Sequence, residues 1–190
     1  MEIVYKYLIP GLWACWAVYW WIASRDVKVS VREESALSRF AHIGPLLFAA
    51  LLCALPDWPL AWLGARFLTP GAASFAFGAA LLAAGLAFAV WARFVLGRNW
   101  SGTVTLKDGH ELIRRGPYRW VRHPIYTGLL GAFVGTAVAI GQWRAVLAVV
   151  IVCVALWRKL RLEERWLSEK FGAAYARYRE EVAALIPFLL

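Results

Sequence analysis

Charged residues are scarce in this chain of 190 residues, where they make up 17% of the positions while apolar residues make up 62%. A soluble domain of this size needs more polar side chains than that to cover its surface. The composition excludes a disordered chain and a collagen-like chain. It indicates an integral membrane protein instead.

Cysteine is also rare, and the three residues, Cys15, Cys53 and Cys153, all lie inside apolar runs. An odd number without paired spacing argues against a disulfide framework and against a zinc site. The three histidines are too dispersed to form a ligand motif, so we expect no bound metal. No glycine-rich dinucleotide fingerprint follows a strand, and there is no Walker loop.

Acidic residues are outnumbered by basic ones, 12 against 21, which gives a net charge of +9. The basic residues gather in short segments between long apolar runs, whereas a nucleic-acid-binding domain concentrates them on one face. This distribution follows the positive-inside rule, and we expect no nucleic-acid partner. It places segments 25–39, 97–123 and 158–165 in the cytoplasm, and segments 56–71 and 141–144 outside.

Five apolar runs approach the roughly 20 residues that cross a bilayer. They cover residues 5–24, 40–55, 72–96, 124–140 and 145–157. The tail, 158–186, has apolar residues at helical spacing and is expected to form a separate amphipathic helix. The predicted fold is an all-α integral membrane protein with about five transmembrane helices, a C-terminal amphipathic helix and a cytoplasmic C-terminus. Residues 1–190 form one membrane domain, and the alanine-, arginine- and tryptophan-rich composition favours a bacterial inner membrane.

Small residues recur at four-residue spacing in two of the predicted spans. Ala76, Ala80 and Ala84 form one such series, Ala79, Ala83 and Ala87 form another, and Gly131 and Gly135 form a GxxxG pair. This spacing lets two membrane helices approach closely. We therefore expect helix contacts at these residues.

The densest group of polar residues is the segment 116–128, with the sequence GPYRWVRHPIYTG. Pro124 suits the first position of a helix and disfavours helix at the residue before it, so His123 is expected at the start of the fourth span. Free N–H groups and the positive end of the helix favour an anion there. Arg119 and Arg122 add positive charge, and the segment predicts a carboxylate or phosphate site at the membrane surface.

A second polar group covers residues 158–165 and contains the adjacent carboxylates Glu163 and Glu164. Neighbouring helix positions point about 100° apart. One carboxylate can therefore contact a ribose or an amine while the other holds an arginine. The alternative interpretation is a solvent-exposed helix start of mixed charge.

These motifs, taken together, resemble the isoprenylcysteine carboxyl methyltransferase family of integral membrane enzymes over residues 90–187. The matching pieces are LGRNWSG at 96–102, GPY at 116–118, RHPIYTG at 122–128, Glu163-Glu164, Phe171-Gly172, Tyr175, Tyr178 and Pro187. The related phospholipid methyltransferases share the Arg-His-Pro-x-Tyr-x-Gly and Glu-Glu pieces. The resemblance divides the chain into two N-terminal spans of unassigned role, residues 1–70, and a methyltransferase core, residues 72–190.

The resemblance implies S-adenosylmethionine as methyl donor, bound in a pocket on the cytoplasmic side. The residues that it assigns to this pocket are Gly116, Pro117, Tyr118, Arg122, His123, Pro124, Tyr126, Glu163 and Glu164. It also implies a lipophilic acceptor that reaches the site from the bilayer, as a small molecule or a lipidated substrate. Four basic residues compete to hold the carboxylate of such an acceptor: Arg93, Arg158, Lys159 and Arg161.

The chemistry of the acceptor decides whether a base is needed. A carboxylate is ionised at neutral pH and needs none, whereas an amine must lose a proton, for which Glu163 and Glu164 are candidates.

Two other functions stay open beside the carboxyl methyltransferase. They are a phospholipid or amine N-methyltransferase and an NADPH-dependent membrane reductase of the sterol type, which is usually longer. A non-enzymatic scaffold explains the composition but not the spacing of the motifs.

Overall fold

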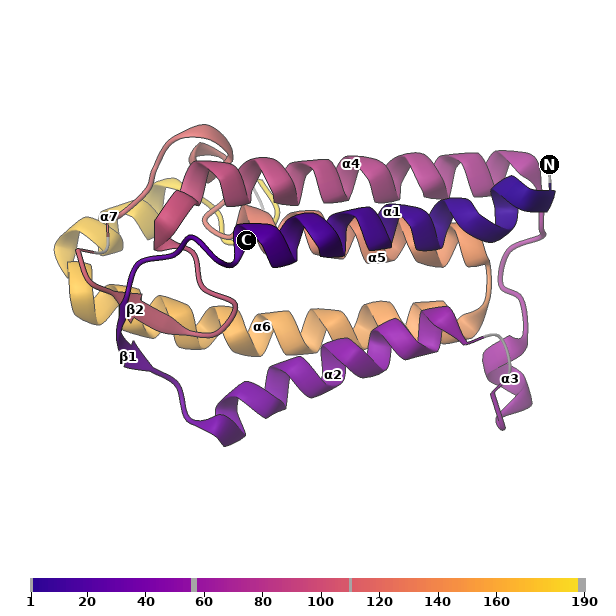
Figure 1. Ribbon diagram of the computed structural model, residues 1–190, viewed down its shortest axis with the longest axis horizontal. Coiled ribbons are helices and arrows are strands. Elements are labelled where there is room, and N and C mark those ends of the chain that lie inside the picture. Colours follow the sequence, from indigo (N-terminus) through magenta and orange to yellow (C-terminus); the bar gives the residue numbers. More distant parts are fainter. Residues whose placement is uncertain (1, 56–57, 110, 188–190) are drawn as a thin grey trace.

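Long helices run along the length of the molecule (Figure 1). The computed structural model describes residues 2–55, 58–109 and 111–187. The long helices are α1 (Glu2–Ala23), α2 (Ala36–Ala54), α4 (Ala72–Leu96), α5 (Pro124–Ile140) and α6 (Trp143–Phe171). The shorter elements are α3 (Ala61–Gly64), α7 (Ala173–Glu181) and the 3₁₀ turns η1 (Gly97–Asn99) and η2 (Gly116–Arg119).

The apolar character of the helices fits a membrane bundle. Within the described residues, two helices, 36–54 and 72–99, are long and apolar enough to cross a membrane, and α5 is a shorter apolar helix. The predicted spans 72–96 and 124–140 coincide with α4 and α5. Both are bounded by strong local signals, because Gly71 and Gly97 flank α4 while Pro124 begins α5 and the left-handed Gly141 ends it.

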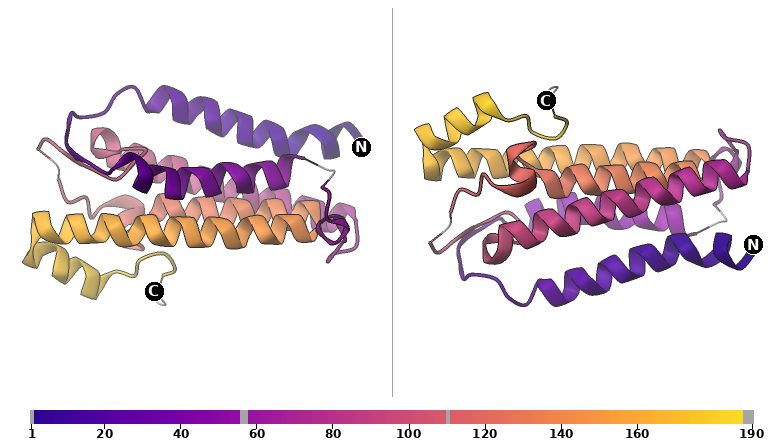
Figure 2. Two further views of the ribbon diagram at one scale, coloured as in Figure 1. Left: turned by 90° about the horizontal axis from the view of Figure 1, so that it is seen from below. Right: turned by 90° about the horizontal axis from the view of Figure 1, so that it is seen from above.

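The separate amphipathic helix predicted over 158–186 is wrong. Helix α6 continues without interruption from Trp143 to Phe171 because no glycine or proline lies between residues 158 and 171. Gly172, with φ of 51°, then ends α6. The chain turns back as α7 over the end of the bundle (Figure 2).

The all-α prediction also needs one correction, because the structure contains a two-stranded antiparallel sheet. Strand β1 (Ser30–Glu33) lies between α1 and α2, and it pairs with β2 (Thr105–Lys107), which lies between α4 and α5. Strands of four and three residues are too short for alternation to reveal them in the sequence. The sheet joins the N-terminal helix pair to the rest of the bundle at one end (Figure 1).

The polar connections gather at that same end. The sheet, the segment 97–123 and α7 lie there, while α3 and the turn between α5 and α6 lie at the opposite end (Figures 1 and 2). The three segments rich in basic residues therefore share one side of the bundle, as the charge distribution predicts. At the opposite end, Nη1 of Arg144 donates hydrogen bonds of 2.6–2.8 Å to carbonyl oxygens that end α2.

The closest helix contact joins α4 to α5 through glycines spaced seven residues apart. Gly78 and Gly85 on α4 face Gly135 and Gly128 on α5. A Cβ atom on Gly135 would lie 2.4 Å from the backbone nitrogen of Leu82 and 2.6 Å from the carbonyl oxygen of Gly78. The two backbones therefore touch directly, and a side chain on either helix would separate them.

The two predicted alanine series have different positions on α4. Ala76, Ala80 and Ala84 are exposed, whereas Ala79 of the other series is buried in one cluster with Ala132 of α5. Gly131 lies beside the contact, since a Cβ atom there would come no closer than 3.9 Å to Gly85 Cα. Of the predicted GxxxG pair, Gly135 is at the point of closest approach.

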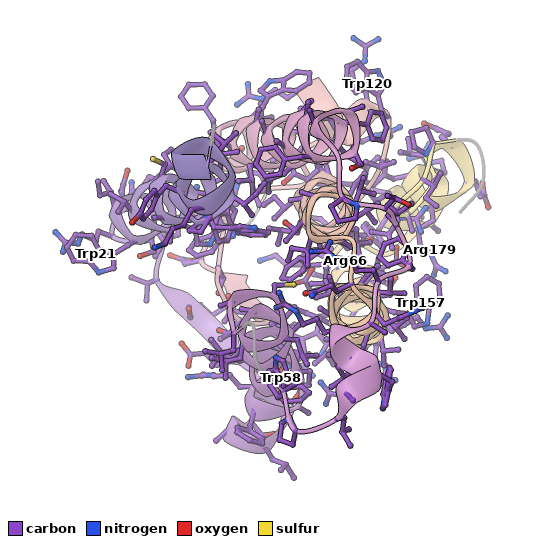
Figure 3. The ribbon with its side chains drawn as sticks, turned by 90° about the vertical axis from the view of Figure 1, so that its right-hand side faces the viewer. Trp21, Trp58, Arg66, Trp120, Trp157 and Arg179 are labelled. Carbon is purple, nitrogen blue, oxygen red and sulfur yellow. The ribbon has the colours of Figure 1, made fainter. Side chains whose placement is uncertain are left out.

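Large aromatic side chains project outward from the bundle. Trp21, Trp120 and Trp157 point away from the helices (Figure 3), and each is exposed. Arg25 lies over the ring of Trp21 at 3.8 Å from its centroid. Exposed tryptophans with a neighbouring cation are typical of residues that meet lipid at a membrane interface.

Candidate active site

Residues 121–123 are held in place by the C-terminal segment. The N–H of Arg122 donates to the carbonyl of Ala183 at 2.8 Å, and the N–H of His123 donates to the carbonyl of Ala184 at 3.0 Å. His123 is the N-cap of α5 and Pro124 is its first residue, as predicted. Backbone hydrogen bonds to the C-terminal segment therefore hold the main chain at Arg122 and His123 in place.

Glu164 forms the centre of a buried group of charges. Its Oε1 accepts a hydrogen bond from Nε of Arg122 at 2.8 Å and lies 2.6 Å from Nη2 of the same guanidinium. Nε2 of His123 lies 3.4 Å from Oε1, and Nε of Arg179 lies 3.6 Å from Oε2. The side chains of Arg122 and Glu164 are only 8% and 9% exposed. Arg122 is thus neutralised within the protein.

The start of α5 differs from the open anion site that the sequence suggests. The carbonyl of His123 accepts hydrogen bonds from the N–H groups of Tyr126, at 3.0 Å, and Thr127, at 3.1 Å. Pro124 has no N–H to offer. The negative charge beside this helix end comes from the glutamates of α6, so the protein supplies its own anions.

Glu163 faces a different set of groups from its neighbour, as the separation of adjacent helix positions predicts. Its Oε1 accepts a 2.5 Å hydrogen bond from the hydroxyl of Tyr126, and its Oε2 lies 3.5 Å from Nδ1 of His123. Nζ of Lys159 lies 4.0 Å from Oε1. The rings of His123 and Tyr126 stack with centroids 5.5 Å apart. Glu163 therefore links the start of α5 to Lys159 on α6.

The charges in this group stabilise one another. Burial acts to lower the pKa of His123, but its hydrogen bonds with Glu163 and Glu164 outweigh burial and raise that pKa above 6.5. Burial acts to raise the pKa of Glu164, but hydrogen bonds with His123 and Arg122 lower it to about 2. The pKa of Glu163 is also lowered, because its hydrogen bond with His123 and the charge of Lys159 outweigh burial. Both glutamates are therefore ionised at neutral pH.

These shifts predict how stability depends on pH. The contribution of His123 is fully present below pH 6.5 and is lost as pH rises through its raised pKa. The contribution of Glu164 is present above pH 4.5 and is lost as pH falls toward 2. We therefore expect the thermal unfolding midpoint in detergent to be highest between pH 4.5 and 6.5.

The control for this prediction is the variant His123→Gln, measured over the same pH range. This variant should lose the alkaline decline and keep an acidic one, since Glu163 and Glu164 still titrate there. A wild-type midpoint that rises steadily from neutral to alkaline pH would contradict the assignment.

A cavity of about 260 Å³ begins at these side chains and extends between the helices. His123, Tyr126, Lys159 and Glu163 line its polar end. Residues 99–105, which follow α4, form one wall. The apolar end is lined by Trp16, Trp20, Leu46, Leu129 and Leu156, which come from α1, α2, α5 and α6. The cavity thus joins a charged end to an apolar end that points into the bundle.

Three buried polar atoms along this cavity have no hydrogen-bond partner among the described residues. They are Nε1 of Trp16, Oδ1 of Asn99 and Oγ1 of Thr105. Buried polar atoms in native proteins are almost always paired, either within the protein or with water or a ligand. A ligand with its own donors and acceptors would satisfy them.

The structure brings most of the predicted pocket residues to this cavity. Tyr118, Arg122, His123, Tyr126 and Glu163 line it. Glu164 lies beside it and holds Arg122 and His123. Gly116, Pro117 and Pro124 belong to the turns that place these side chains, and none of the three is among the described residues lining the cavity.

The four basic candidates for the acceptor are separated by the fold. Of the four, all within the described residues, Lys159 lines the cavity. Arg93 donates to the carbonyls of Gly97 and Ala23 and so ties the ends of α4 and α1 together. Nη1 of Arg158 donates to the carbonyl of Ser38 on α2 at 3.1 Å, and Arg161 is exposed.

The motifs in the sequence did not predict that side chains of the first two spans, α1 and α2, line the cavity. Trp16 and Trp20 stack with centroids 4.8 Å apart, and Trp20 meets the edge of Trp100 at 5.4 Å. The spacing of four residues between the two tryptophans puts them on one face of α1. That signal was present in the sequence, but it fits a lipid-facing stripe equally well.

The fold is that of a membrane-embedded helical bundle with a polar site at one end. A solved structure of the eukaryotic intramembrane Ras methyltransferase, isoprenylcysteine carboxyl methyltransferase, matches it with a TM-score of 0.57. That match covers 84% of this chain and 55% of the other at 23% sequence identity, and it concerns the fold alone. Residues 73–174 match the family described as phospholipid methyltransferase. This stretch is more than half of the chain, and the chain belongs to that family.

Curated relatives are similar to about half of the chain. The protein-S-isoprenylcysteine O-methyltransferase of Saccharomyces cerevisiae is 34% identical over 99 residues, which are 49% of this chain and 40% of that protein. The protein-S-isoprenylcysteine O-methyltransferase A of Arabidopsis thaliana is 34% identical over 90 residues, which are 45% of this chain and 44% of that protein. The matched segments thus span less than half the length of these two relatives.

Proposed function

We propose that the protein is a methyltransferase that uses S-adenosylmethionine to esterify a lipophilic carboxylate at the cytoplasmic face of a membrane. The observation that carries this proposal is the cavity in which Lys159 and Glu163 meet at the polar end while apolar side chains of α1 and α2 line the other. The names of the similar proteins, which describe O-methylation of protein S-isoprenylcysteine, support the same chemistry.

The residues along the cavity fit the donor. S-adenosylmethionine supplies a methyl group that its positively charged sulfonium already activates. Ionised Glu163 offers a negative charge to such a cation, and the unpaired Oδ1 of Asn99 offers an acceptor to an amino group. Trp100 and Tyr118 provide aromatic faces for a purine. Arg122 and Glu164 keep this wall rigid through their mutual ion pair.

Lys159 is the residue that we assign to the acceptor. Its side chain is buried at the polar end of the cavity, where Nζ donates to the carbonyl of Gly102 at 2.9 Å. The ammonium attracts a carboxylate and orients its oxygen, and a carboxylate is ionised without help from a base. Burial of the acceptor between the helices excludes water that would compete with it. The same positive charge disfavours an amine acceptor, which would need Glu163 as its base.

The acceptor chain fits the apolar end. Trp16, Leu46, Leu129 and Leu156 belong to helices on both sides of the cavity, so an isoprenoid or acyl chain would be surrounded by apolar side chains there. A lipophilic molecule reaches such a space from the bilayer and not from water. The substrate class that follows is a lipid with one carboxylate head group.

We further propose five membrane spans within one domain, with the cavity and the C-terminus on the cytoplasmic side. The support is the position of segments 25–39, 97–123 and 158–165 at one end of the bundle, because basic residues concentrate on the cytoplasmic side. Together with the composition, this arrangement supports a bacterial inner membrane as the location.

Calorimetry on the purified protein tests the donor directly. S-adenosylhomocysteine is expected to bind to the wild-type protein in detergent, and NADPH is not. Binding of NADPH in its place would contradict the methyltransferase and favour the reductase that the sequence leaves open.

Single substitutions then distinguish the residues that bind the methyl donor from the residue that binds the acceptor. We expect His123→Ala to weaken S-adenosylhomocysteine binding at least tenfold, because His123 lines the cavity and its contacts with Glu163 and Glu164 hold these side chains in place. Loss of one charge-assisted contact removes ~1.5–3 kcal/mol. Lys159→Ala should leave that affinity nearly intact and slow single-turnover methyl transfer to a carboxylate lipid. Arg161→Ala, an exposed residue two positions away, should change neither quantity. Equal rates for Lys159→Ala and wild type would remove the acceptor assignment.

A further inference from the structure

We propose that Glu34, at the start of α2, is a positioning residue of the acceptor site, because its buried carboxylate holds the cavity wall 102–104 against which Lys159 is oriented. This inference rests on the proposed function for the role of Lys159. It also gives a role to the connection between the first two spans, to which the motifs assign none.

The carboxylate of Glu34 is buried and directed at one peptide unit. The residue is 6% exposed, and its Oε1 accepts a 2.9 Å hydrogen bond from the N–H of Val104. The N–H of Glu34 in turn donates to the carbonyl of Val104 at 3.1 Å. Two bonds of opposite direction thus join Glu34 to Val104, and they leave little freedom for the backbone there.

The remaining groups around Glu34 fix its orientation. Its Oε2 accepts a 2.7 Å hydrogen bond from the hydroxyl of Ser38, one turn further along α2. Nε2 of the fully buried His42 lies 3.3 Å from Oε1 without hydrogen-bond geometry, so it packs beside the carboxylate and does not bond to it. Arg158 of α6 donates to the hydroxyl and the carbonyl of Ser38. The carboxylate is therefore held by α2 itself and is tied to α6 at the residue before Lys159.

Lys159 holds the same wall from the other side. Its Nζ donates to the carbonyl of Gly102 at 2.9 Å, two residues before Val104. The segment 102–104 is thus bound by a carboxylate from the connection between β1 and α2 and by an ammonium from α6, and it lines the cavity throughout. If Glu34 released Val104, the carbonyl that orients Lys159 would move with the segment.

The backbone pairing of the sheet does not by itself explain why the carboxylate of Glu34 is buried here. Strand β1 already pairs with β2 through backbone hydrogen bonds, with Glu33 opposite Thr105, so the two loops are joined without any charged side chain. Burying a carboxylate has a substantial desolvation penalty, which directed hydrogen bonds offset. The hydrogen bond that Glu34 accepts goes to Val104 in the cavity wall next to the sheet. There the position of the backbone determines where a substrate group can bind.

The kinetic test uses purified protein in lipid nanodiscs with a carboxylate lipid and S-adenosylmethionine. Glu34→Ala is expected to raise KM for the acceptor about tenfold and to change S-adenosylhomocysteine affinity much less. Glu34→Gln should recover most of the loss, because its amide oxygen still accepts from Val104. The matched control is Glu33→Ala, the neighbouring glutamate, which is exposed and pairs with Arg39 at the surface. It should behave as wild type.

A double variant decides whether Glu34 acts through Lys159. In the background of Lys159→Ala, adding Glu34→Ala should raise KM no further, because the group that it positions is already absent. Multiplicative effects of the two substitutions would overturn the proposal.

Amide hydrogen exchange measures how firmly the segment 102–104 is held, and it does not depend on enzymatic activity. Glu34→Ala should speed amide exchange within residues 102–104 at least tenfold, and Glu33→Ala should leave it unchanged. Unchanged exchange in Glu34→Ala would refute the proposal even if the protein methylates carboxylates. A wild-type protein without carboxyl methyltransferase activity would instead overturn the proposed function, and the exchange result would still decide whether Glu34 holds the wall.

Discussion

Replacing Gly135 by alanine is expected to lower the stability of the bundle strongly, by about 3 kcal/mol, because a methyl group there has no space. Its Cβ would lie 2.4 Å from the nitrogen of Leu82 and 2.6 Å from the carbonyl oxygen of Gly78. Both are backbone atoms of α4, so rotation of a side chain does not relieve the overlap. The helices have to separate along their whole contact, and denaturant unfolding in detergent micelles measures the loss.

Gly131→Ala is the matched control for this experiment. The residue lies one turn earlier on α5, and a Cβ atom there comes within 3.9 Å only of Gly85 Cα. Alanine also favours a helix over glycine by up to ~1 kcal/mol. Gly131→Ala should therefore match or slightly exceed wild-type stability. Similar losses for both variants would show that α4 and α5 do not meet through Gly135.

Glu164→Ala is expected to cost about 3–5 kcal/mol of stability, because breaking a buried ion pair leaves its partner charged and unpaired. The partners left behind are Arg122, with a side chain 8% exposed, and buried His123. Both line the cavity. The variant should therefore also bind S-adenosylhomocysteine at least tenfold more weakly than wild type.

The control for Glu164 is Glu169→Ala on the same helix. Glu169 pairs with Arg32 at 2.6 Å, but both side chains are about half exposed. Exposed ion pairs contribute only ~0–1 kcal/mol, and this loss should be small. Thermal unfolding and calorimetry on both variants distinguish the two pairs. Equal stability losses would mean that Glu164 is no more important than a surface charge.

The sequence predicted the parts of this fold that local signals determine. The bounds of α4 and α5 follow from apolar runs that end at glycine or begin at proline. The position of His123 before Pro124 follows from the restriction that proline places on its predecessor. The different directions of Glu163 and Glu164 follow from helix geometry alone. The continuous α6 was missed because a change from apolar to charged residues was taken for a helix end.

Relations between distant residues were settled only by the tertiary structure. The sequence determined that 116–128 and 158–165 carry the polar groups of a membrane bundle. The fold decided that Glu164 neutralises Arg122, 42 positions earlier, and that Lys159 lines the cavity while Arg93 and Arg158 bind backbone carbonyls. It also brought Glu34 to Val104 across 70 residues. The physical reason is that hydropathy and helix signals act within one or two turns, whereas the partner of a buried charge depends on which helices pack together.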